Sequence, residues 1–203
     1  MDDTMRVLVT NDDGIYAKGI EVLAESLARI AEVTVVAPEI ERSAVGHAIT
    51  LNDPLRVEEV HKAGEFFGYA VNGTPADCVK IGISAIMEHR PDAVFSGINP
   101  GTNIGTNAIY SGTVSAAIEG SIMGCCSAAL SVACKRGVCY DYPSEFAVKL
   151  FKTLANRGFP KVLFNVNIPP IPGEEIKGIR LTRQGKMQFR EYFDKREDPS
   201  GRT

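Results

Sequence analysis

Residues 5–38, MRVLVTNDDGIYAKGIEVLAESLARIAEVTVVAP, decide the fold class. Met5 to Thr10 is a short apolar run rich in β-branched residues, which is typical of a buried strand. Lys18 to Ile30 carries apolar residues at helical spacing, and Glu32 to Ala37 is a second strand-like run that stops at Pro38. A strand, a helix and another strand in this order predict a parallel βαβ unit with a right-handed crossover.

The following residues continue this alternation around one small insertion. Leu55 to Val60 and Phe66 to Val71 flank Gly64 and are predicted to pair as an antiparallel hairpin. Further strands are predicted at Asp92 to Ser96, Ala128 to Val132 and Lys161 to Asn167, and further helices at Thr74 to His89, Gly112 to Met123 and Ser144 to Asn156. The predicted fold is a doubly wound, Rossmann-like α/β domain with a mostly parallel sheet.

The C-terminal part has a different character. Pro169 to Gly173 (PPIPG) resembles a linker, and Ile176 to Thr182 has the composition of one more strand. Glu191 to Thr203 is charged and poor in apolar residues, as expected of an extended arm. We therefore expect a single domain over residues 1–203, with an arm that projects from about residue 170.

Composition excludes several classes of protein. The 203 residues are 44% hydrophobic and carry a formal net charge of −3, so no basic excess is available to hold a nucleic-acid polymer. The start of the chain lacks the features of a secretory signal, and no stretch is apolar enough to span a membrane. These features predict a cytoplasmic protein.

The cysteines and histidines do not form a recognisable metal motif. The five cysteines include no C-x-x-C pair, and His47, His61 and His89 are scattered. Buried, reduced thiols are the expected state of the cysteines in a reducing compartment.

Polar side chains follow three of the predicted strands. Asp12 and Asp13 follow the first strand, Ser43 follows the second, and Asn99 follows the strand that begins at Asp92. Ligands of open parallel sheets bind beyond the carboxyl ends of the strands, so these side chains are expected at one edge. Their oxygen atoms suit Mg²⁺, Mn²⁺ or Ca²⁺ rather than zinc or copper. Asn-Asp-Asp-Gly is also a turn sequence, but its place after the first βαβ strand favours a metal site.

A second candidate site is the start of the helix predicted at Gly112. Ser111 can cap this helix, and Gly112 and Thr113 then present backbone N–H groups to a phosphate. A plain helix cap is the alternative. The segment is neither a Walker A loop nor G-x-G-x-x-G, so a dinucleotide cofactor is not predicted.

Two further groups of residues admit two interpretations each. Arg42 and His47 either hold a phosphate or a base, or are solvated surface residues. Phe66, Phe67 and Tyr69 either belong to the core of the hairpin or offer a ring on which a nucleobase stacks.

Four blocks of the chain, taken in order, resemble the survival protein E (SurE) family of nucleotidases. The blocks are VLVTNDDGIYAKGI (7–20), VVAPEIERSAVGHAITLNDPLR (35–56), VNGTPADCVKIG (71–82) and PDAVFSGINPGTNIGTNAIYSGTVSAAIEG (91–120). FNVNIP (164–169) also matches. The resemblance covers roughly residues 5 to 185, and it is the combination of blocks that is specific.

The resemblance implies a metal-dependent phosphatase acting on nucleoside 5′- and 3′-monophosphates, and some members also trim short polyphosphate. It implies one Mg²⁺ or Mn²⁺ ion per subunit and a homodimer or homotetramer with exchanged C-terminal segments. The metal ligands that it implies are Asp12, Asp13, Ser43 and Asn99, of which Asp12, Asp13 and Asn99 are also catalytic. The phosphate-facing residues that it implies are Asn11, Ser111, Gly112 and Thr113.

Two departures from the family pattern and two other functions accompany this hypothesis. Ala44 follows Ser43 where members usually have glycine, and the chain ends at Thr203 where members usually continue, which affects the oligomer rather than the metal site. The alternatives are a non-catalytic nucleotide sensor on the same scaffold and a metal-dependent glycosidase or nucleoside hydrolase. Whether either aspartate acts as base or nucleophile stays open.

Overall fold

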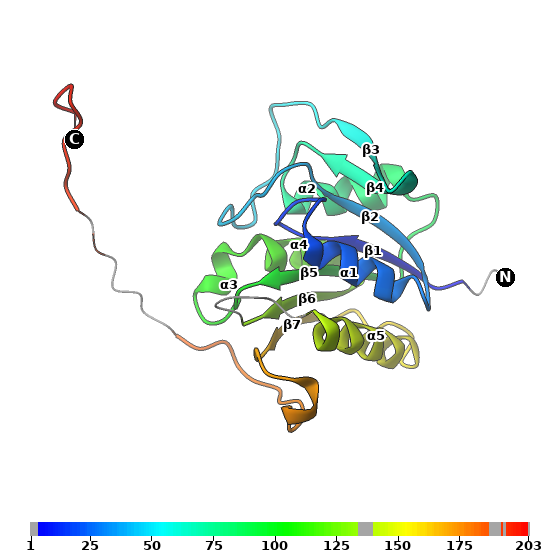
Figure 1. Cartoon of the computed structure of the whole chain (residues 1–203). Helices are drawn as coiled ribbons and strands as arrows, with labels where there is room; N and C mark the ends of the chain where they lie inside the picture. The colour runs from blue at the N-terminus through cyan, green and yellow to red at the C-terminus, as the bar shows by residue number, and fades with distance from the viewer. Residues whose placement is uncertain (1–3, 134–139, 187–191, 193, 203) are drawn as a thin grey trace.

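A seven-stranded sheet lies at the centre of the computed structural model, which describes residues 4–133, 140–186, 192 and 194–202 (Figure 1). Its order is β3-β4-β2-β1-β5-β6-β7, and all neighbours are parallel except β3 and β4. The strands are β1 (Arg6–Thr10), β2 (Glu32–Pro38), β3 (Val57–Lys62), β4 (Glu65–Val71), β5 (Ala93–Pro100), β6 (Cys126–Val132) and β7 (Leu163–Ile168). This is the predicted Rossmann-like α/β architecture.

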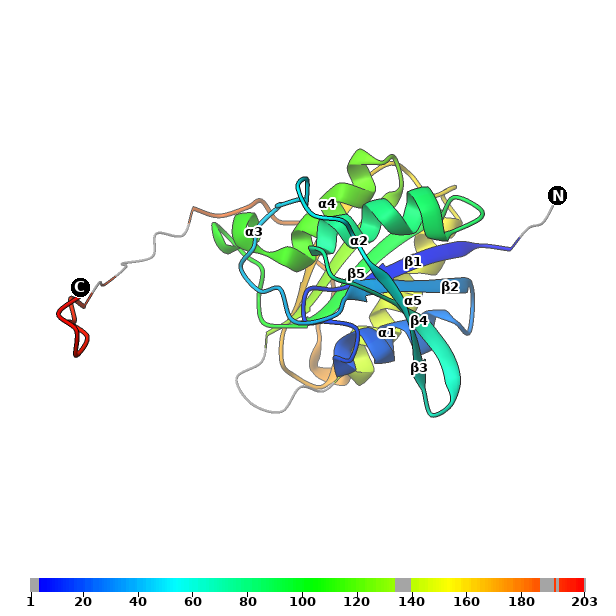
Figure 2. The ribbon, with the colours of Figure 1, turned by 90° about the horizontal axis from the view of Figure 1, so that it is seen from above.

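Helices cover both faces of the sheet, as Figure 2 shows from above. The helices are α1 (Lys18–Leu27), α2 (Pro75–Ile81), α3 (Asn107–Tyr110), α4 (Gly112–Ile122) and α5 (Asp141–Ala155). α1 and α5 pack together on one face, and α2 and α4 pack together on the other. None of the helices in the described part of the chain has the length and apolar character that a membrane crossing requires.

Strand β1 lies in the middle of the sheet and is buried on both sides. Val7 and Val9 pack into the core beneath α1 and α5, whereas Leu8 packs into the core beneath α2 and α4. Successive side chains of a strand point to opposite faces, so a strand covered by helices on both faces must be apolar throughout. This explains the uninterrupted apolar run that marked the first strand in the sequence.

The predicted hairpin forms, and it also extends the main sheet. β3 and β4 pair antiparallel, while β4 pairs in parallel with β2, with Tyr69 opposite Val36. Gly68 permits the close approach of the two strands, because a Cβ atom there would lie 2.6 Å from the Val35 Cβ. The insertion is therefore an edge of the central sheet.

Three helix boundaries differ from the predictions by three residues, and the first of them is the end of α1, which lies at Leu27 rather than Ile30. The helix expected to reach His89 begins with a Thr74 capping box but ends as a π-helical turn over Gly82–Ile86. The helix expected from Ser144 begins earlier, at Asp141, with Pro143 in its first turn. Proline lacks only an N–H that the first turn does not use, so it does not prevent an earlier start.

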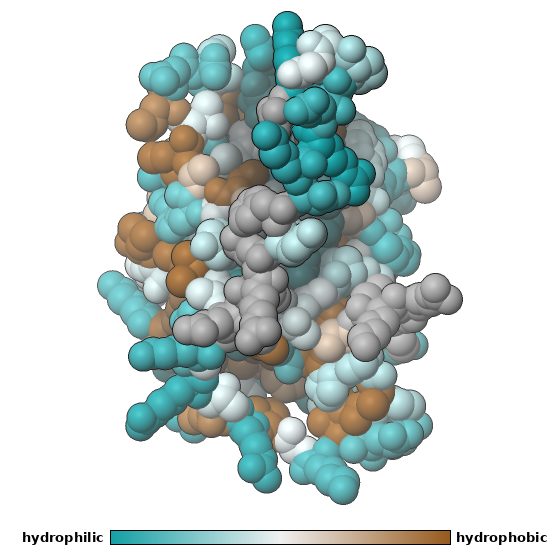
Figure 3. All heavy atoms as spheres, turned by 90° about the vertical axis from the view of Figure 1, so that its left-hand side faces the viewer, coloured by the Kyte–Doolittle hydropathy of each residue, from teal (hydrophilic) through white to brown (hydrophobic). Residues whose placement is uncertain are grey.

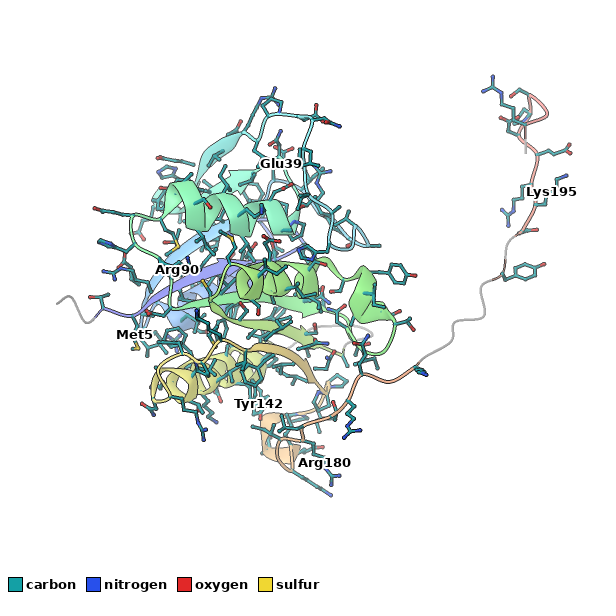
Figure 4. All side chains as sticks on the ribbon, turned by 180° about the vertical axis from the view of Figure 1, so that it is seen from behind. Met5, Glu39, Arg90, Tyr142, Arg180 and Lys195 are labelled. Atoms are coloured by element: carbon teal, nitrogen blue, oxygen red, sulfur yellow. The ribbon has the colours of Figure 1, made fainter. Side chains whose placement is uncertain are left out.

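The strand predicted at Ile176 to Thr182 is wrong. These residues are irregular, and Ile179 and Leu181 expose 75% and 93% of their surface. A strand needs a partner, and the described residues offer none here. The chain instead leaves the body as the predicted projecting arm, on which Arg180 and Lys195 are labelled in Figure 4.

We predict that Gly19→Ala destabilises the protein, although alanine is the better helix former. A Cβ atom at position 19 would lie 2.1 Å from the Ile98 carbonyl oxygen, because α1 packs directly on β5. The expected loss is about 1–3 kcal/mol in the free energy of unfolding, measured by urea denaturation. Gly185→Ala is the control, since a Cβ there meets no atom within 4 Å. Equal midpoints for the two variants would contradict the packing argument.

Candidate functional site

The loops after β2 and β5 flank the loop after β1 at the carboxyl edge of the sheet, because β1 lies between β2 and β5 (Figure 1). The Arg42 backbone N–H donates to the Asp12 carbonyl oxygen over 2.7 Å, and the Ile15 N–H donates to that of Pro38 over 2.9 Å. At Gly14, φ is +94° and a Cβ would lie 3.2 Å from the Ile40 carbonyl carbon. Glycine therefore allows the loop after β1 to contact the loop after β2.

The start of α4 packs directly against Asp12. The Thr113 hydroxyl donates to Asp12 Oδ1 over 2.6 Å, and both residues are buried. A Cβ at Gly112 would lie only 2.6 Å from the Asp12 Cβ. Ser111 caps the helix by accepting the Val114 N–H over 3.1 Å. The helix start thus holds Asp12 in place, and the phosphate-facing role of these residues stays a prediction.

The two adjacent carboxylates are energetically unfavourable as a pair of anions. Burial raises the pKa of Asp12, against which hydrogen bonds from Thr113 act, and the nearby Glu41 carboxylate raises it further. Burial raises the pKa of Asp13 to about 7, with further contributions from the charges of Asp12 and then Glu41. A cation between the carboxylates would remove this penalty.

Ser43 and Asn99 occupy the two flanking loops. Ser43 is exposed, and its hydroxyl donates to Glu41 Oε1 over 2.5 Å. The Asn99 side-chain amide donates to the Gly101 carbonyl oxygen over 2.9 Å, and this bond does not use the Asn99 Oδ1. Within the described residues, three or more His, Cys, Asp or Glu side chains nowhere gather as a metal site. A cation at this edge would therefore need hydroxyl and amide oxygens in addition to Asp12 and Asp13.

Several buried oxygen atoms near the same edge have no hydrogen-bond partner among the described residues. They are Asn11 Oδ1, Thr10 Oγ1 and Ser96 Oγ. Thr10 and Ser96 are neighbours in the register of β1 and β5, and Asn11 follows Thr10 directly. Buried polar atoms are nearly always satisfied by protein, water or a ligand, so this edge has the polarity of a binding site.

Comparisons with known proteins agree with this geometry. The model of the family "Survival protein SurE" matches residues 7–191. The chain belongs to the SurE family. It is 52% identical to the 5′-nucleotidase SurE of Syntrophobacter fumaroxidans, over 97% of this chain and 79% of that protein. It is 49% identical to the 5′-nucleotidase SurE of Synechococcus elongatus, over 98% and 78% respectively.

A solved structure of a SurE protein shares the fold. The crystal structure of the SurE protein from Aquifex aeolicus superposes with a TM-score of 0.84 at 42% identity, covering 97% of this chain and 79% of that one. The family membership inferred from the four sequence blocks is thereby confirmed, together with the fold class.

A network of asparagine side chains lies beside Asp12, and it was not predicted from the sequence. Asn103 donates from its side-chain amide to the Ser131 hydroxyl over 2.8 Å and, over 3.5 Å, to the Thr113 hydroxyl. Its backbone N–H donates to Asn167 Oδ1, and its carbonyl accepts from the Asn165 amide, both over 2.8 Å. The spacing of Asn165 and Asn167 could have indicated this network, because residues two positions apart in a strand point to the same face of the sheet.

The structure gives Arg42 and His47 partners within the protein, and their role toward a phosphate or a base stays a prediction. Arg42 donates from Nη2 to the Asn72 carbonyl oxygen over 3.2 Å, and His47 Nε2 lies 2.8 Å from Glu119 Oε2. Both side chains therefore make contacts inside the protein. Glu119 is buried on α4, and nothing in the local sequence marked it as the partner of a histidine 72 residues earlier.

The aromatic residues of the hairpin do not reach this site. Phe66 contacts His61 and Tyr69 edge-on, with ring centroids 5.7 and 5.1 Å apart. Phe66 and Tyr69 line a cavity of about 300 Å³ that includes Arg6, at the amino end of β1. The same cavity is lined by Glu32 and Val33 at the amino end of β2, opposite the carboxyl edge. Phe66 and Tyr69 therefore lie away from the candidate site, and stacking of a nucleobase on an aromatic residue of the hairpin stays a prediction.

We predict that the metal-free protein loses stability as the pH rises from about 4 to about 7, and that Asp13→Asn removes much of this loss. The pKa of Asp13 is raised on folding from 3.8 to about 7, so the unfolded chain releases its proton first. The variant should match the wild type near pH 4 and exceed it above pH 7 by more than about 1 kcal/mol, after allowance for partial exposure.

The measurement is urea denaturation in a chelator across this pH range. Glu25→Gln, which removes an exposed carboxylate on α1, should keep the wild-type profile. If the free energy of unfolding of Asp13→Asn depends on pH in the same way as that of the wild type, burial and charge do not raise the pKa of Asp13.

Proposed function

We propose that this chain is a 5′-nucleotidase that hydrolyses nucleoside 5′- and 3′-monophosphates to nucleoside and phosphate with a divalent cation as cofactor. The observation that carries the proposal is the Asp12-Asp13 pair at the carboxyl edge of the sheet, in which Asp13 is half-buried and Asp12 is buried and meets the start of α4. Membership of the SurE family and relatives named 5′-nucleotidase at about half identity support the same reaction.

We propose that Asp12, Asp13, Ser43 and Asn99 hold one Mg²⁺ or Mn²⁺ ion per subunit. The donor set consists of oxygen atoms, which hard divalent cations prefer. The raised pKa values of both aspartates support this assignment, because a buried and a half-buried carboxylate side by side are stabilised by a compensating charge. Ser43 and Asn99 stand in the loops on either side of that pair.

The residues of this chain divide the chemistry between them. When bound, the cation supplies charge that neutralises the phosphate and favours deprotonation of water. Asp12 is committed to the Thr113 hydroxyl, so Asp13 is the carboxylate that can orient the attacking water and accept its proton. Ser111, whose hydroxyl oxygen accepts the Val114 N–H, keeps its own proton to donate to a phosphate oxygen.

The remaining phosphate contacts are assigned to the residues around this pair. We propose that Asn11 and the backbone N–H groups of Gly112 and Thr113 also face the phosphate. N–H groups at the start of a helix are suited to this task, since they point at the ligand and the helix dipole favours an anion. They would stabilise the charge that develops on the phosphoryl oxygens.

We also propose that the chain is a single cytoplasmic domain over residues 1–203 that works as a homodimer or homotetramer. The exposed apolar residues Ile179 and Leu181 on the arm support an assembly, because such side chains are normally covered. Cys78, Cys125 and Cys126 are free and buried, which supports a reducing compartment.

We predict that phosphate release from nucleoside monophosphates requires Mg²⁺ or Mn²⁺ and falls about a hundredfold or more in Asp12→Asn and Asp13→Asn. Each variant loses a negative ligand, and a bound cation contributes several kcal/mol of transition-state stabilisation. The assay compares chelator-treated protein with reconstituted protein on 5′- and 3′-monophosphates of each base and on tripolyphosphate.

Four outcomes would contradict this proposal. Full activity after metal removal, or in both aspartate variants, would exclude the assigned site. Nucleotide binding without turnover would favour a sensor, and release of free base would favour a nucleoside hydrolase. Glu25→Gln on the exposed face of α1 serves as the control variant and should keep wild-type activity.

We predict that Gly112→Ala lowers activity at least about tenfold while the protein stays folded. The added Cβ would lie 2.6 Å from the Asp12 Cβ and 2.9 Å from Asp12 Oδ2, so the carboxylate must move. Ile122→Ala on the same helix, where the side chain is 68% exposed, is the matched control and should retain activity. Circular dichroism checks folding, and unchanged kcat/KM in Gly112→Ala would contradict the contact.

A further inference from the structure

Glu119 brings three separate parts of the fold together beside the proposed site. It lies on α4 and exposes only 4% of its surface. Its Oε2 lies 2.8 Å from His47 Nε2, and its Oε1 lies 3.2 Å from the Lys80 ammonium nitrogen on α2. A buried carboxylate is costly unless it is paired, so both partners are needed to keep this charge in place.

His47 belongs to the segment 39–56 between β2 and β3, which we call the Ser43 loop because it carries Ser43. Arg42 fixes the start of this loop through its N–H bond of 2.7 Å to the Asp12 carbonyl oxygen. Beyond Ser43, the Gly46 N–H donates to the Tyr110 carbonyl oxygen over 3.1 Å, and His47 meets Glu119. Ser43 is therefore held from both sides, while its own hydroxyl contacts only the Glu41 side chain of the same loop.

The far end of the loop is fixed to α2. Thr50 donates from its backbone N–H and its hydroxyl to the Asp77 carboxylate over 3.0 and 2.7 Å. Burial alone would raise the pKa of Asp77, but hydrogen bonds from Thr50 and Thr74 hold it below its ordinary value. Between these anchors, Ala44 has a positive φ of 56°, a conformation that a non-glycine residue keeps only when its surroundings impose it.

We propose that Glu119 is a positioning residue that, through His47, holds the Ser43 loop against α4. The same helix holds Asp12 through Thr113, so α4 acts as a common frame for both halves of the site. The expected effect of Glu119 on metal binding rests on the proposed function, in which Ser43 is a metal ligand. The anchoring of the loop stands on the contacts themselves.

Lys80 has a secondary part in this arrangement. Its side chain is 48% exposed, whereas that of His47 is 30% exposed and that of Glu119 6%. Lys80 compensates the second carboxylate oxygen from the surface, where water screens its charge. It joins α4 to α2 and does not touch the Ser43 loop through this contact. His47 is thus the link that transmits the position of Glu119 to Ser43.

The first test is hydrogen exchange on the full chain without metal. In Glu119→Ala, peptides covering residues 43–50 should exchange about tenfold faster than in the wild type, because a charge-assisted bond to the loop is lost. Glu119→Gln should show a smaller increase, since its amide oxygen still accepts a bond from His47. The matched control is Glu21→Ala, which removes a carboxylate paired with Lys18 and Lys62 far from the loop. Unchanged exchange in Glu119→Ala would overturn the proposal.

The second test measures Mn²⁺ binding to the metal-free protein by calorimetry and by electron paramagnetic resonance. Glu119→Ala should weaken Mn²⁺ binding about tenfold, as expected for a residue that orients a ligand. In a Ser43→Ala background, Glu119→Ala should weaken Mn²⁺ binding no further, because the ligand that Glu119 positions is already absent. Equal weakening in both backgrounds would show that Glu119 acts elsewhere.

The two tests separate this inference from the proposed function. A wild type that binds no Mn²⁺ would overturn the proposed metal site, and hydrogen exchange would still decide whether Glu119 anchors the loop. If Glu119→Ala does not fold, His47→Ala breaks the same contact from the more exposed side and carries the same expectations. Mn²⁺ affinity and loop exchange equal to the wild type in His47→Ala would overturn the inference.

Discussion

The hydrogen bond from the Thr113 hydroxyl to Asp12 is the contact on which the candidate site depends. It joins the loop after β1 to the start of α4, and it is possible only because Gly112 leaves room for the Asp12 side chain. Helix α4 packs on β5 and β6 and also carries Glu119, so one rigid element positions several loops. Figure 3 shows the side of the molecule that lies on the left in Figure 1, on which hydrophilic and hydrophobic residues are both exposed.

This arrangement concentrates negative charge where the fold can least accommodate it. Burial raises the pKa of both Asp12 and Asp13, the charge of Asp12 raises the pKa of Asp13 further, and Glu41 adds to both effects. The penalty is offset by the two apolar cores on either side of the sheet. Such local instability is typical of functional sites, because a site arranged to receive a ligand is incompletely satisfied without it.

Much of the fold was predictable because the strands and helices have strong local patterns. The apolar run of β1 and the capping box of Thr74 identify their elements directly. Helix α5 begins at Asp141, three residues before its predicted start, because the first turn of a helix tolerates a proline such as Pro143. The expected strand at Ile176 to Thr182 failed because residue composition does not supply a neighbouring strand.

By itself, the sequence determined the order of strands and helices, the SurE family, and the polar residues that follow each strand. Only the tertiary structure decided which of these residues meet. The pairing of His47 with Glu119 and the network around Asn103 join residues far apart in the chain. Such contacts depend on how helices and strands pack, and local patterns of apolar and polar residues carry no record of them. The proposed ligands could therefore be identified from the sequence, whereas the residues that hold them in place could be identified only from the fold.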